Sequence, residues 1–335
     1  MKYLFELSKE HKKIPTSEII ACLKSENICF SIIESNEDVF IVETDSDDFN
    51  FKRFSERLSY TYYIDRYLFS CPPSIVDLKK EAIKNKIESK GSIAVRCKNR
   101  SKNINSQDII RTLADVYSSG REVELDNPDL EVRGLITDSA VYIGLKLIEI
   151  NRSQFEERKV QFRPFFSPIS LHPKIARLMV NLSSIKNNET LLDPFCGTGG
   201  ILIEAGIIGA KIIGSDIEEK MIEGCKKNLD FYKIKNYKLF CSDIGDISKD
   251  IGKVDAVVTD LPYGKSTTTK GEDMSKLYER AFKNISTLLK ENGKAVIGLS
   301  NKDFINLGKK YFSIIEKHDL RAHRSLTRYF VVYQK

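Results

Sequence analysis

The residues best suited to chemistry are acids that each follow a short apolar run. Asp193 ends the run Leu191-Leu192 and opens the glycine-rich segment DPFCGTGG, after which a helix is predicted from Ile201. Glycines let the backbone pass close to a ligand and adopt positive φ angles. At the carboxyl end of a central strand, such a turn is where doubly wound sheets bind nucleotides. We therefore predict a nucleotide-like cofactor at this turn, contacted by Asp193, Phe195, Cys196, Gly197, Thr198 and Gly199.

Two more acids end the next two predicted strands. Asp216 follows Asp193 by about 23 residues and is positioned to bind ribose hydroxyls. Asp243 ends the third strand, where its carboxylate would accept a hydrogen bond from the exocyclic amine of adenine. With the adjacent Ile217 and Ile244, these acids complete the predicted cofactor site.

A nicotinamide dinucleotide is the main alternative for this site. The spacing D-x-x-x-G-x-G-G differs from the G-x-G-x-x-G typical of dinucleotide binding. Asp193 would also repel a pyrophosphate, whereas it would attract the ammonium group of S-adenosylmethionine. S-adenosylmethionine is therefore the favoured cofactor.

The segment Asp260-Leu261-Pro262-Tyr263-Gly264 is suited to methylation of a planar exocyclic amine. A carboxylate and a neighbouring carbonyl that accept both N–H bonds would direct the nitrogen lone pair toward a methyl donor, and Asp260 could then take the proton. Pro262 stiffens the turn, and Tyr263 offers a ring on which a flipped base can stack. We predict Asp260, Pro262 and Tyr263 as catalytic residues, with Asp260 also bordering the cofactor. No metal is needed, because a sulfonium supplies the electrophile, and Cys196 is expected to be a packed side chain rather than a nucleophile.

The elements that position these residues alternate between strands and amphipathic helices. Strands are predicted at 191–192, 212–213, 239–241, 256–259 and 295–299, with helices between them. This pattern predicts a parallel sheet covered on both faces, closed by two strands at 312–315 and 329–333.

The chain before this sheet has a different organisation. Residues 1–70 predict the order β-α-β-β-α-β of a ferredoxin-like domain. Pro72 and Pro73 begin a second segment, 71–150, in which Ser106 is the expected N-cap of a helix. Residues 151–167 are expected to be a linker, and residues 168–335 the catalytic domain.

Composition narrows the class of protein. The 335 residues suffice for two or three domains, and the sequence contains no apolar run near the roughly 20 residues that span a bilayer. Residues 1–160 carry 25 basic and 27 acidic side chains, whereas residues 161–335 carry 28 basic and 20 acidic ones. The second half has the excess of positive charge and is therefore the better candidate for binding a polyanion. Seven scattered cysteines without a C-x-x-C pair indicate reduced thiols in a cytosolic protein, and the four histidines are not spaced as metal ligands.

Taken together, the motifs identify a resemblance to the archaeal tRNA (guanine at position 10)-N2-dimethyltransferases. The catalytic half resembles class I, Rossmann-like, S-adenosylmethionine-dependent methyltransferases, whose sheet has seven mostly parallel strands. Residues 90–129 resemble the THUMP RNA-binding domain. Three further segments, 163–177, 264–267 and 323–328, narrow the resemblance from methyltransferases in general to this family.

The resemblance implies a tRNA substrate, one or two methyl groups added to the guanosine N2 amine, and no obligatory protein partner. It also implies that the THUMP domain grips the tRNA 3′ end, for which the basic stripe Arg96, Lys98, Arg100 and Lys102 is the candidate. The other predicted RNA contacts are Lys265, Arg324 and Arg328, and residues 265–271 are a candidate substrate lid.

Several alternatives stay open at this point. The same chemistry could act at another tRNA position, such as position 6, or on ribosomal RNA, and a non-catalytic tRNA-binding protein is a third possibility. Family members often carry two prolines after the catalytic acid, whereas this chain has Leu261 at the first of these positions.

Overall fold

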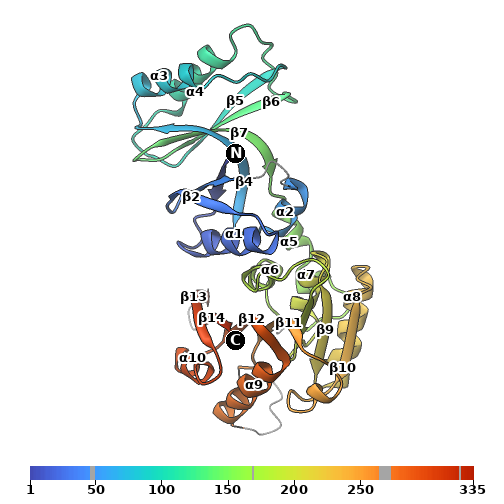
Figure 1. The fold of residues 1–335 in the computed structure, drawn as a ribbon. Helices are drawn as coiled ribbons and strands as arrows, with labels where there is room; N and C mark the ends of the chain where they lie inside the picture. Colours follow the sequence, from blue (N-terminus) through green and yellow to red (C-terminus); the bar gives the residue numbers. More distant parts are fainter. Residues whose placement is uncertain (46–49, 168–169, 264–272, 324–325) are drawn as a thin grey trace. The chain divides into compact units, whose positions relative to one another are not determined.

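The computed structural model describes residues 1–335 except 46–49, 168–169, 264–272 and 324–325 (Figure 1). The side chains of residues 322, 323 and 326 are also excluded from the description. Contacts divide the chain into two compact units. The first contains Met1–Thr16, Ile28–Ser55 and Tyr60–Asn151, and the second contains Ser17–Asn27, Glu56–Ser59 and Arg152–Lys335. Each unit holds one seven-stranded sheet.

The sheet of the first unit has the strand order β2-β3-β1-β4-β7-β6-β5. The first part of the chain follows the predicted β-α-β-β-α-β order of a ferredoxin-like fold. The strands are β1 (Lys2–Leu7), β2 (Phe30–Ser35), β3 (Val39–Thr44), β4 (Thr61–Cys71), β5 (Ile93–Asn99), β6 (Leu130–Ile136) and β7 (Val141–Glu149), and the first two helices are α1 (Ile14–Ser25) and α2 (Phe51–Arg57).

The long strand β4 joins the two halves of this sheet. It pairs antiparallel with β1 along one edge and with β7, from Tyr63 to Cys71, along the other. The sheet is therefore continuous across the boundary that we expected at residues 70 and 71. The helices α3 (Ile75–Lys84) and α4 (Ser106–Tyr117) bury Leu78 and Leu113 in one apolar cluster with the strands β4 to β7. The N-cap of α4 is Asn105, whose side chain accepts a hydrogen bond from the Gln107 amide, and not Ser106 as predicted.

The second unit contains the predicted mostly parallel sheet, in the order β10-β9-β8-β11-β12-β14-β13. The five strands from β10 to β12 pair in parallel, and β14 and β13 close the edge in antiparallel pairing. The strands are β8 (Thr190–Asp193), β9 (Lys211–Asp216), β10 (Tyr237–Cys241), β11 (Val254–Asp260), β12 (Leu289–Leu299), β13 (Ser313–His323) and β14 (Leu326–Gln334), so the last two are longer than predicted.

Helices cover this sheet because their apolar residues recur at helical spacing. In α9 (Met274–Leu288), the side chains of Leu277, Ala281 and Ile285 lie on one face and pack into the main core cluster. Other helices among the described residues of this unit are α6 (Pro173–Leu182), α7 (Gly200–Ile207), α8 (Glu219–Phe231) and the short α10 (Ile305–Gly308), with 3₁₀ turns at Ile247–Lys249 and Lys302–Phe304.

The segment predicted as a linker contains short helical elements. Residues Ser153–Glu157 form α5, and Val160–Phe162 form a 3₁₀ turn. Phe155 and Arg163 are buried in the second unit, so part of this segment packs within that unit.

The strand order of the second unit determines where a ligand can bind. From β8 the chain proceeds to β9 and β10 on one side of the sheet, and then to β11 and β12 on the other. At such a reversal, the loops leaving two adjacent strands diverge and open a crevice beyond their carboxyl ends. Asp193 and Asp260 end the two strands that flank this point.

None of the helices in the described residues has the length and apolar character needed to cross a membrane.

Candidate active site

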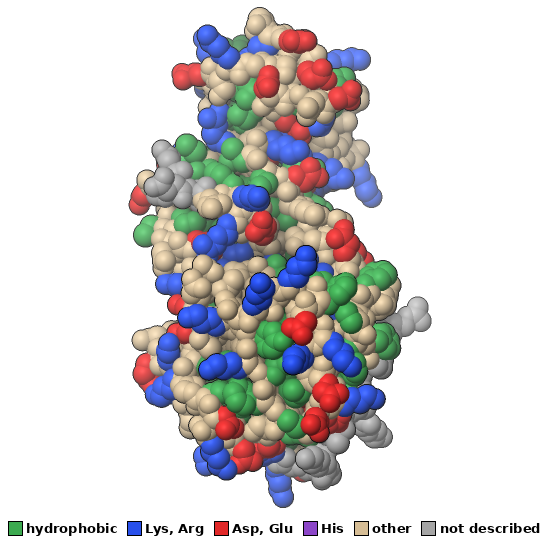
Figure 2. Space-filling view, turned by 90° about the vertical axis from the view of Figure 1, so that its right-hand side faces the viewer, with side chains coloured by type: hydrophobic (Ala, Val, Ile, Leu, Met, Phe, Trp, Pro, Cys, Tyr) green, Lys and Arg blue, Asp and Glu red, His purple; other side chains and the backbone are tan. Residues whose placement is uncertain are grey.

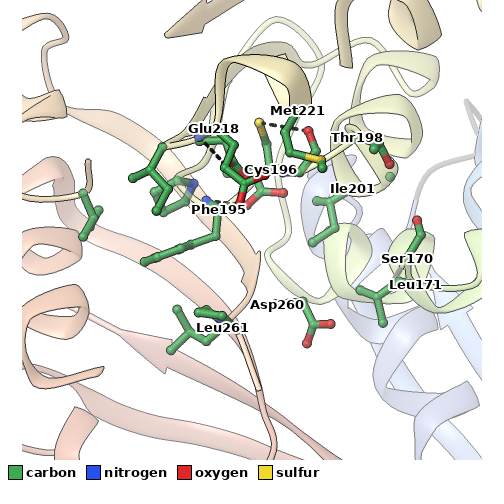
Figure 3. Close-up of a pocket in the computed structure, with 18 of the residues that line it drawn as sticks. Ser170, Leu171, Phe195, Cys196, Thr198, Ile201, Glu218, Met221, Asp260 and Leu261 are labelled. Carbon is green, nitrogen blue, oxygen red and sulfur yellow. Dashed lines mark hydrogen bonds between the residues drawn. The ribbon is translucent and has the colours of Figure 1, made fainter. Parts of the chain in front are cut away.

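A cavity of about 530 Å³ lies in the crevice at the carboxyl ends of these strands. In Figure 3, Asp260 and Leu261 lie on one side of it and Glu218 and Met221 on the opposite side, with Phe195 between them. The structure brings nearly all of the predicted cofactor and catalytic residues to its wall. These are Asp193, Phe195, Cys196, Gly197, Thr198, Asp216, Ile217, Asp243, Ile244, Asp260, Pro262 and Tyr263.

Two glycines shape the turn between β8 and α7. Gly197 has a φ of +50°, and a Cβ added there would meet nothing within 4 Å, so its missing side chain leaves open room for a ligand. Gly199 has a φ of +84° and does not line the cavity; the Sγ atom of Cys225 occupies the space that a Cβ would need. The absence of a Cβ at Gly199 therefore allows close packing of Cys225 beneath the turn, and its contact with a cofactor stays a prediction.

Asp216 connects the turn to the end of β9. Its Oδ2 accepts a hydrogen bond of 2.9 Å from the Gly197 amide, and its Oδ1 accepts one of 3.0 Å from the Glu218 amide. Each carboxylate oxygen has a second lone pair, so Asp216 can still accept from two adjacent hydroxyls of a ribose. This geometry suits the role predicted for Asp216.

Asp193 is the most deeply buried acid of the cavity. Its Oδ1 accepts hydrogen bonds from the Thr259 hydroxyl at 2.7 Å and the Phe195 amide at 3.2 Å. Burial raises the pKa of Asp193 to about 7, although these two hydrogen bonds oppose the shift. A carboxyl group in this condition has a strong electrostatic preference for a cationic ligand.

Asp243 is held in place at the end of β10. Its Oδ1 accepts a hydrogen bond of 2.7 Å from the Gly245 amide and forms an ion pair with Arg280 of α9. Arg280 also lines the cavity, so a cationic side chain accompanies the acid predicted to meet the adenine amine.

Asp260 lies where the catalytic acid was predicted, at the tip of β11 and in the cavity wall. Its Oδ1 accepts a hydrogen bond from the Tyr263 hydroxyl, and its Oδ2 lies 3.6 Å from Nη1 of Arg328. Burial raises the pKa of Asp260 above its ordinary value, while the charge of Arg328 and the Tyr263 hydroxyl oppose that shift.

A glycine on the neighbouring strand makes room for this carboxylate. Asp260 pairs in register with Gly298 of β12, and a Cβ at Gly298 would collide with the Asp260 carboxylate. Gly298 thus allows the acid to lie against the sheet.

The turn after Asp260 also explains the unexpected Leu261. The Leu261 amide donates a hydrogen bond of 3.1 Å to the Gly298 carbonyl, which a proline could not do. The Leu261 side chain is buried in the main core cluster. The next carbonyl, that of Pro262, accepts a hydrogen bond of 2.8 Å from Tyr278, and this contact fixes the far side of the turn.

Cys196 is buried beneath the glycine turn. The neighbouring Cys225 thiol and burial raise the pKa of the Cys196 thiol well above its ordinary value. A thiol that stays protonated is a poor nucleophile, in agreement with the expected packing role.

Several residues of the wall were not predicted from the sequence. Glu218 follows Asp216 by two residues, and the second acid could have been noticed. Ser167, Ser170 and Leu171 precede α6 within residues 163–177, which contributed to the family resemblance but were not assigned to the site. Nothing in the sequence marked Met221, Leu277 or Arg280 as site residues, and Ile201 was noted only as the start of a helix.

The basic stripe of the first unit is only partly available to a ligand. The Arg100 side chain is 9% exposed and forms ion pairs to Glu6 at 2.9 Å and to Asp38 at 2.8 Å. Its donors already bind groups within the unit, and the contact of Arg100 with RNA stays a prediction. Arg96 forms an ion pair with Glu131 but remains 45% exposed, and Lys98 and Lys102 are exposed.

The other predicted RNA contacts divide into two groups. Lys265, Arg324 and the candidate lid 265–271 lie outside the described residues. Arg328 is described, and its side chain belongs to the cavity wall. Figure 2 shows that the basic side chains on the visible face are interspersed with acidic ones.

Among the side chains that the structure describes, no three His, Cys, Asp or Glu residues form a group that could hold a metal ion.

Comparisons with known proteins agree with the sequence resemblance. Residues 161–329 match the RMKL-like methyltransferase domain, and residues 73–146 match the THUMP domain. The chain is 36% identical over 338 residues to the tRNA (guanine(10)-N2)-dimethyltransferase of Methanothermobacter thermautotrophicus, with 100% of both chains covered. It is 30% identical over 357 residues to the enzyme of the same name from Methanocaldococcus jannaschii, with 99% of both chains covered. Among solved structures it is similar to TrmN from Thermus thermophilus, with a TM-score of 0.57 and 16% identity over the full length of both chains.

Proposed function

This chain belongs to the tRNA (guanine(10)-N2)-dimethyltransferase family, and on that premise we propose that its cavity methylates the exocyclic N2 amine of guanosine 10 in tRNA. The product is N2-methylguanosine and, after a second transfer, N2,N2-dimethylguanosine. One observation carries the proposal: the carboxylate of Asp260, the acid proposed to bind the amine, borders the same cavity as the glycine turn and Asp216. Methyl donor and acceptor can therefore meet in one space.

The residues of the glycine turn suit S-adenosylmethionine. Asp216 would accept hydrogen bonds from the ribose hydroxyls, Asp243 and Ile244 would meet the adenine, and Asp193 would face the ammonium group. When bound, S-adenosylmethionine supplies an electrophilic methyl group on a sulfonium. The open room at Gly197 lets the backbone approach this ligand closely.

Asp260 prepares the acceptor nitrogen. An exocyclic amine is a weak nucleophile, because its lone pair is delocalised into the ring. Asp260 accepts one N–H and the Leu261 carbonyl accepts the other, which holds the lone pair toward the donor. The nitrogen would take the methyl group that the sulfonium supplies, and Asp260 would accept the proton that the cationic nitrogen then loses. Tyr263 offers its ring to the flipped base.

The first unit would bind the rest of the tRNA. We propose the division into residues 1–70, 71–150, 151–167 and 168–335, with Arg96, Lys98 and Lys102 as phosphate contacts in the THUMP segment, and Lys265 and Arg324 as contacts in the catalytic segment. The seven cysteines are free thiols in the structure, which supports a reducing, cytoplasmic setting. We propose no obligatory protein partner.

Methyl transfer to unmodified tRNA transcripts tests this function. Transcripts with guanosine at position 10 should accept labelled methyl groups from S-adenosylmethionine, and matched transcripts with adenosine at position 10 should not. Mass spectrometry of the digested product should show N2-methyl- and N2,N2-dimethylguanosine. Label at another nucleotide would exclude position 10, and no label in any tRNA would exclude the enzyme activity.

The variant Asp260→Ala tests whether Asp260 takes part in methyl transfer. General acid–base groups typically contribute about 100-fold to 10,000-fold to a rate, so we expect at least a hundredfold loss of transfer. S-adenosylhomocysteine should still bind the variant by calorimetry. The matched control is Asp250→Asn, at an exposed acid that does not line the cavity. Loss of cofactor affinity in the Asp260 variant would instead assign this residue a structural role.

A further inference from the structure

Arg328 enters the cavity beside the proposed catalytic acid because of strand register. Gly298 of β12 pairs with Asp260 on one side and with Phe330 of β14 on the other. Residues two apart on a strand point to the same face, so Arg328 projects on the same face as Phe330 and Asp260. Because Gly298 has no side chain, the guanidinium of Arg328 can approach Asp260 across β12. The resulting Nη1–Oδ2 separation is 3.6 Å.

The guanidinium keeps unused hydrogen-bonding capacity. At 3.6 Å its contact with Asp260 is an ion pair and too long for a hydrogen bond. Its Cζ lies 5.2 Å from the centre of the Tyr263 ring, which fixes its orientation by a cation–π contact. Within the described part of the chain, its buried Nε has no hydrogen-bond partner. Arginine has five N–H donors, so the side chain has donors to offer to a ligand in the cavity.

Asp260 and Arg328 together match one edge of guanine. Along its Watson–Crick edge, guanine presents the N2 and N1 donors and then the O6 acceptor. A carboxylate followed by a guanidinium presents acceptors and then donors, in the same sequence. Enzymes that flip a base read it through this edge. Adenine presents a donor where guanine presents O6, so it would place an N–H against the guanidinium.

We propose that Arg328 is a specificity-determining residue that donates a hydrogen bond to O6 of the target guanine while Asp260 holds the amine. This inference rests on the proposed function and deepens it. On this inference Arg328 recognises the target base itself, whereas the sequence had predicted only that Arg328 contacts the RNA.

The test combines a protein variant with a base analogue. Transcripts assembled by ligation carry guanine or 2-aminopurine at position 10; the analogue keeps the 2-amino group but lacks O6 and the N1 hydrogen. Wild-type kcat/KM should fall at least tenfold with 2-aminopurine, since a good hydrogen-bonded contact to a base contributes about 1–3 kcal/mol of discrimination. Arg328→Met should lower kcat/KM for guanine several-fold more than kcat/KM for 2-aminopurine, and should therefore remove the part of the preference that O6 supplies.

Two further measurements make the result decisive. Calorimetry with S-adenosylhomocysteine should give the same affinity for wild type and Arg328→Met, which shows that the variant is folded. If the variant lowers activity equally on both bases, Arg328 acts only through Asp260 or through stability, and the specificity role is overturned. A wild-type enzyme that methylates no tRNA would defeat the proposed function itself. Arg328→Lys, which keeps the charge but loses the planar donor fork, should recover only part of the preference.

Discussion

The pKa of Asp193 predicts that cofactor binding depends on pH in a specific direction. Burial raises this pKa to about 7 in the cofactor-free protein, against an ordinary value near 4. The acid is therefore largely protonated at pH 5.5 and about half ionised at pH 7. Only the ionised form attracts the ammonium group of the cofactor, so binding should strengthen as the pH rises through this window.

The size of the effect follows from the same pKa. Between pH 5.5 and pH 7 the ionised fraction of a group with a pKa of 7 rises roughly fifteenfold, which corresponds to about 1.6 kcal/mol of binding free energy. Protein stability without cofactor should change in the opposite direction. The folded state binds the proton more tightly than the unfolded state, so the contribution of Asp193 to stability falls as the pH rises from about 4 to 7.

Isothermal titration calorimetry with S-adenosylhomocysteine measures the effect. The range ends at pH 7, because α-amino groups begin to lose their proton above it. The control ligand is 5′-methylthioadenosine, which keeps the ribose proposed to bind Asp216 but has no amine, and its affinity should not follow the same curve. Asp193→Asn should remove the pH dependence for S-adenosylhomocysteine. An affinity that stays constant from pH 5.5 to pH 7 in the wild-type protein would refute the reasoning.

Two other predictions concern the support of the site. Gly298→Ala places the alanine methyl group against the Asp260 carboxylate. The rate of methyl transfer should therefore fall at least tenfold, while the affinity for S-adenosylhomocysteine stays the same. A fully active variant would show that the strand shifts to accommodate the alanine side chain. Glu204→Gln should lower the free energy of unfolding, measured in urea, by about 3–5 kcal/mol. The buried Glu204 of α7 pairs with Arg177 at 2.9 Å and with Arg158 at 2.8 Å, and both cations would lose this carboxylate. A change below about 1 kcal/mol would mean that neither ion pair contributes to stability.

Much of the catalytic unit could be predicted because its signals are local in sequence. The acids at the strand ends and the glycines of the turn are defined by neighbours within a few residues. Parallel strands bring their carboxyl ends to one edge, so Asp193, Asp216, Asp243 and Asp260 had to converge once the strand order was known. The residues expected to bind cofactor and amine accordingly line one cavity, apart from Gly199.

Predictions for individual side chains outside these motifs were less secure. Arg100 belongs to a basic stripe in the sequence, but the fold of the first unit places Glu6 and Asp38 beside it and leaves its side chain only 9% exposed. A charge pattern gives no information about acids that are distant in sequence. The same limit applies to Arg280, which meets Asp243 because α9 packs against the segment that follows β10.

The sequence by itself therefore determined the class of chemistry, since an acid, a turn and a stacking ring next to one another define the reacting groups. Only the tertiary structure decided which distant side chains complete the site. Asp260 and Arg328 are separated by 68 positions, and they meet because Gly298 between them leaves the sheet surface bare. The physical reason is that strand pairing and register, which no short segment encodes, decide which residues share a face.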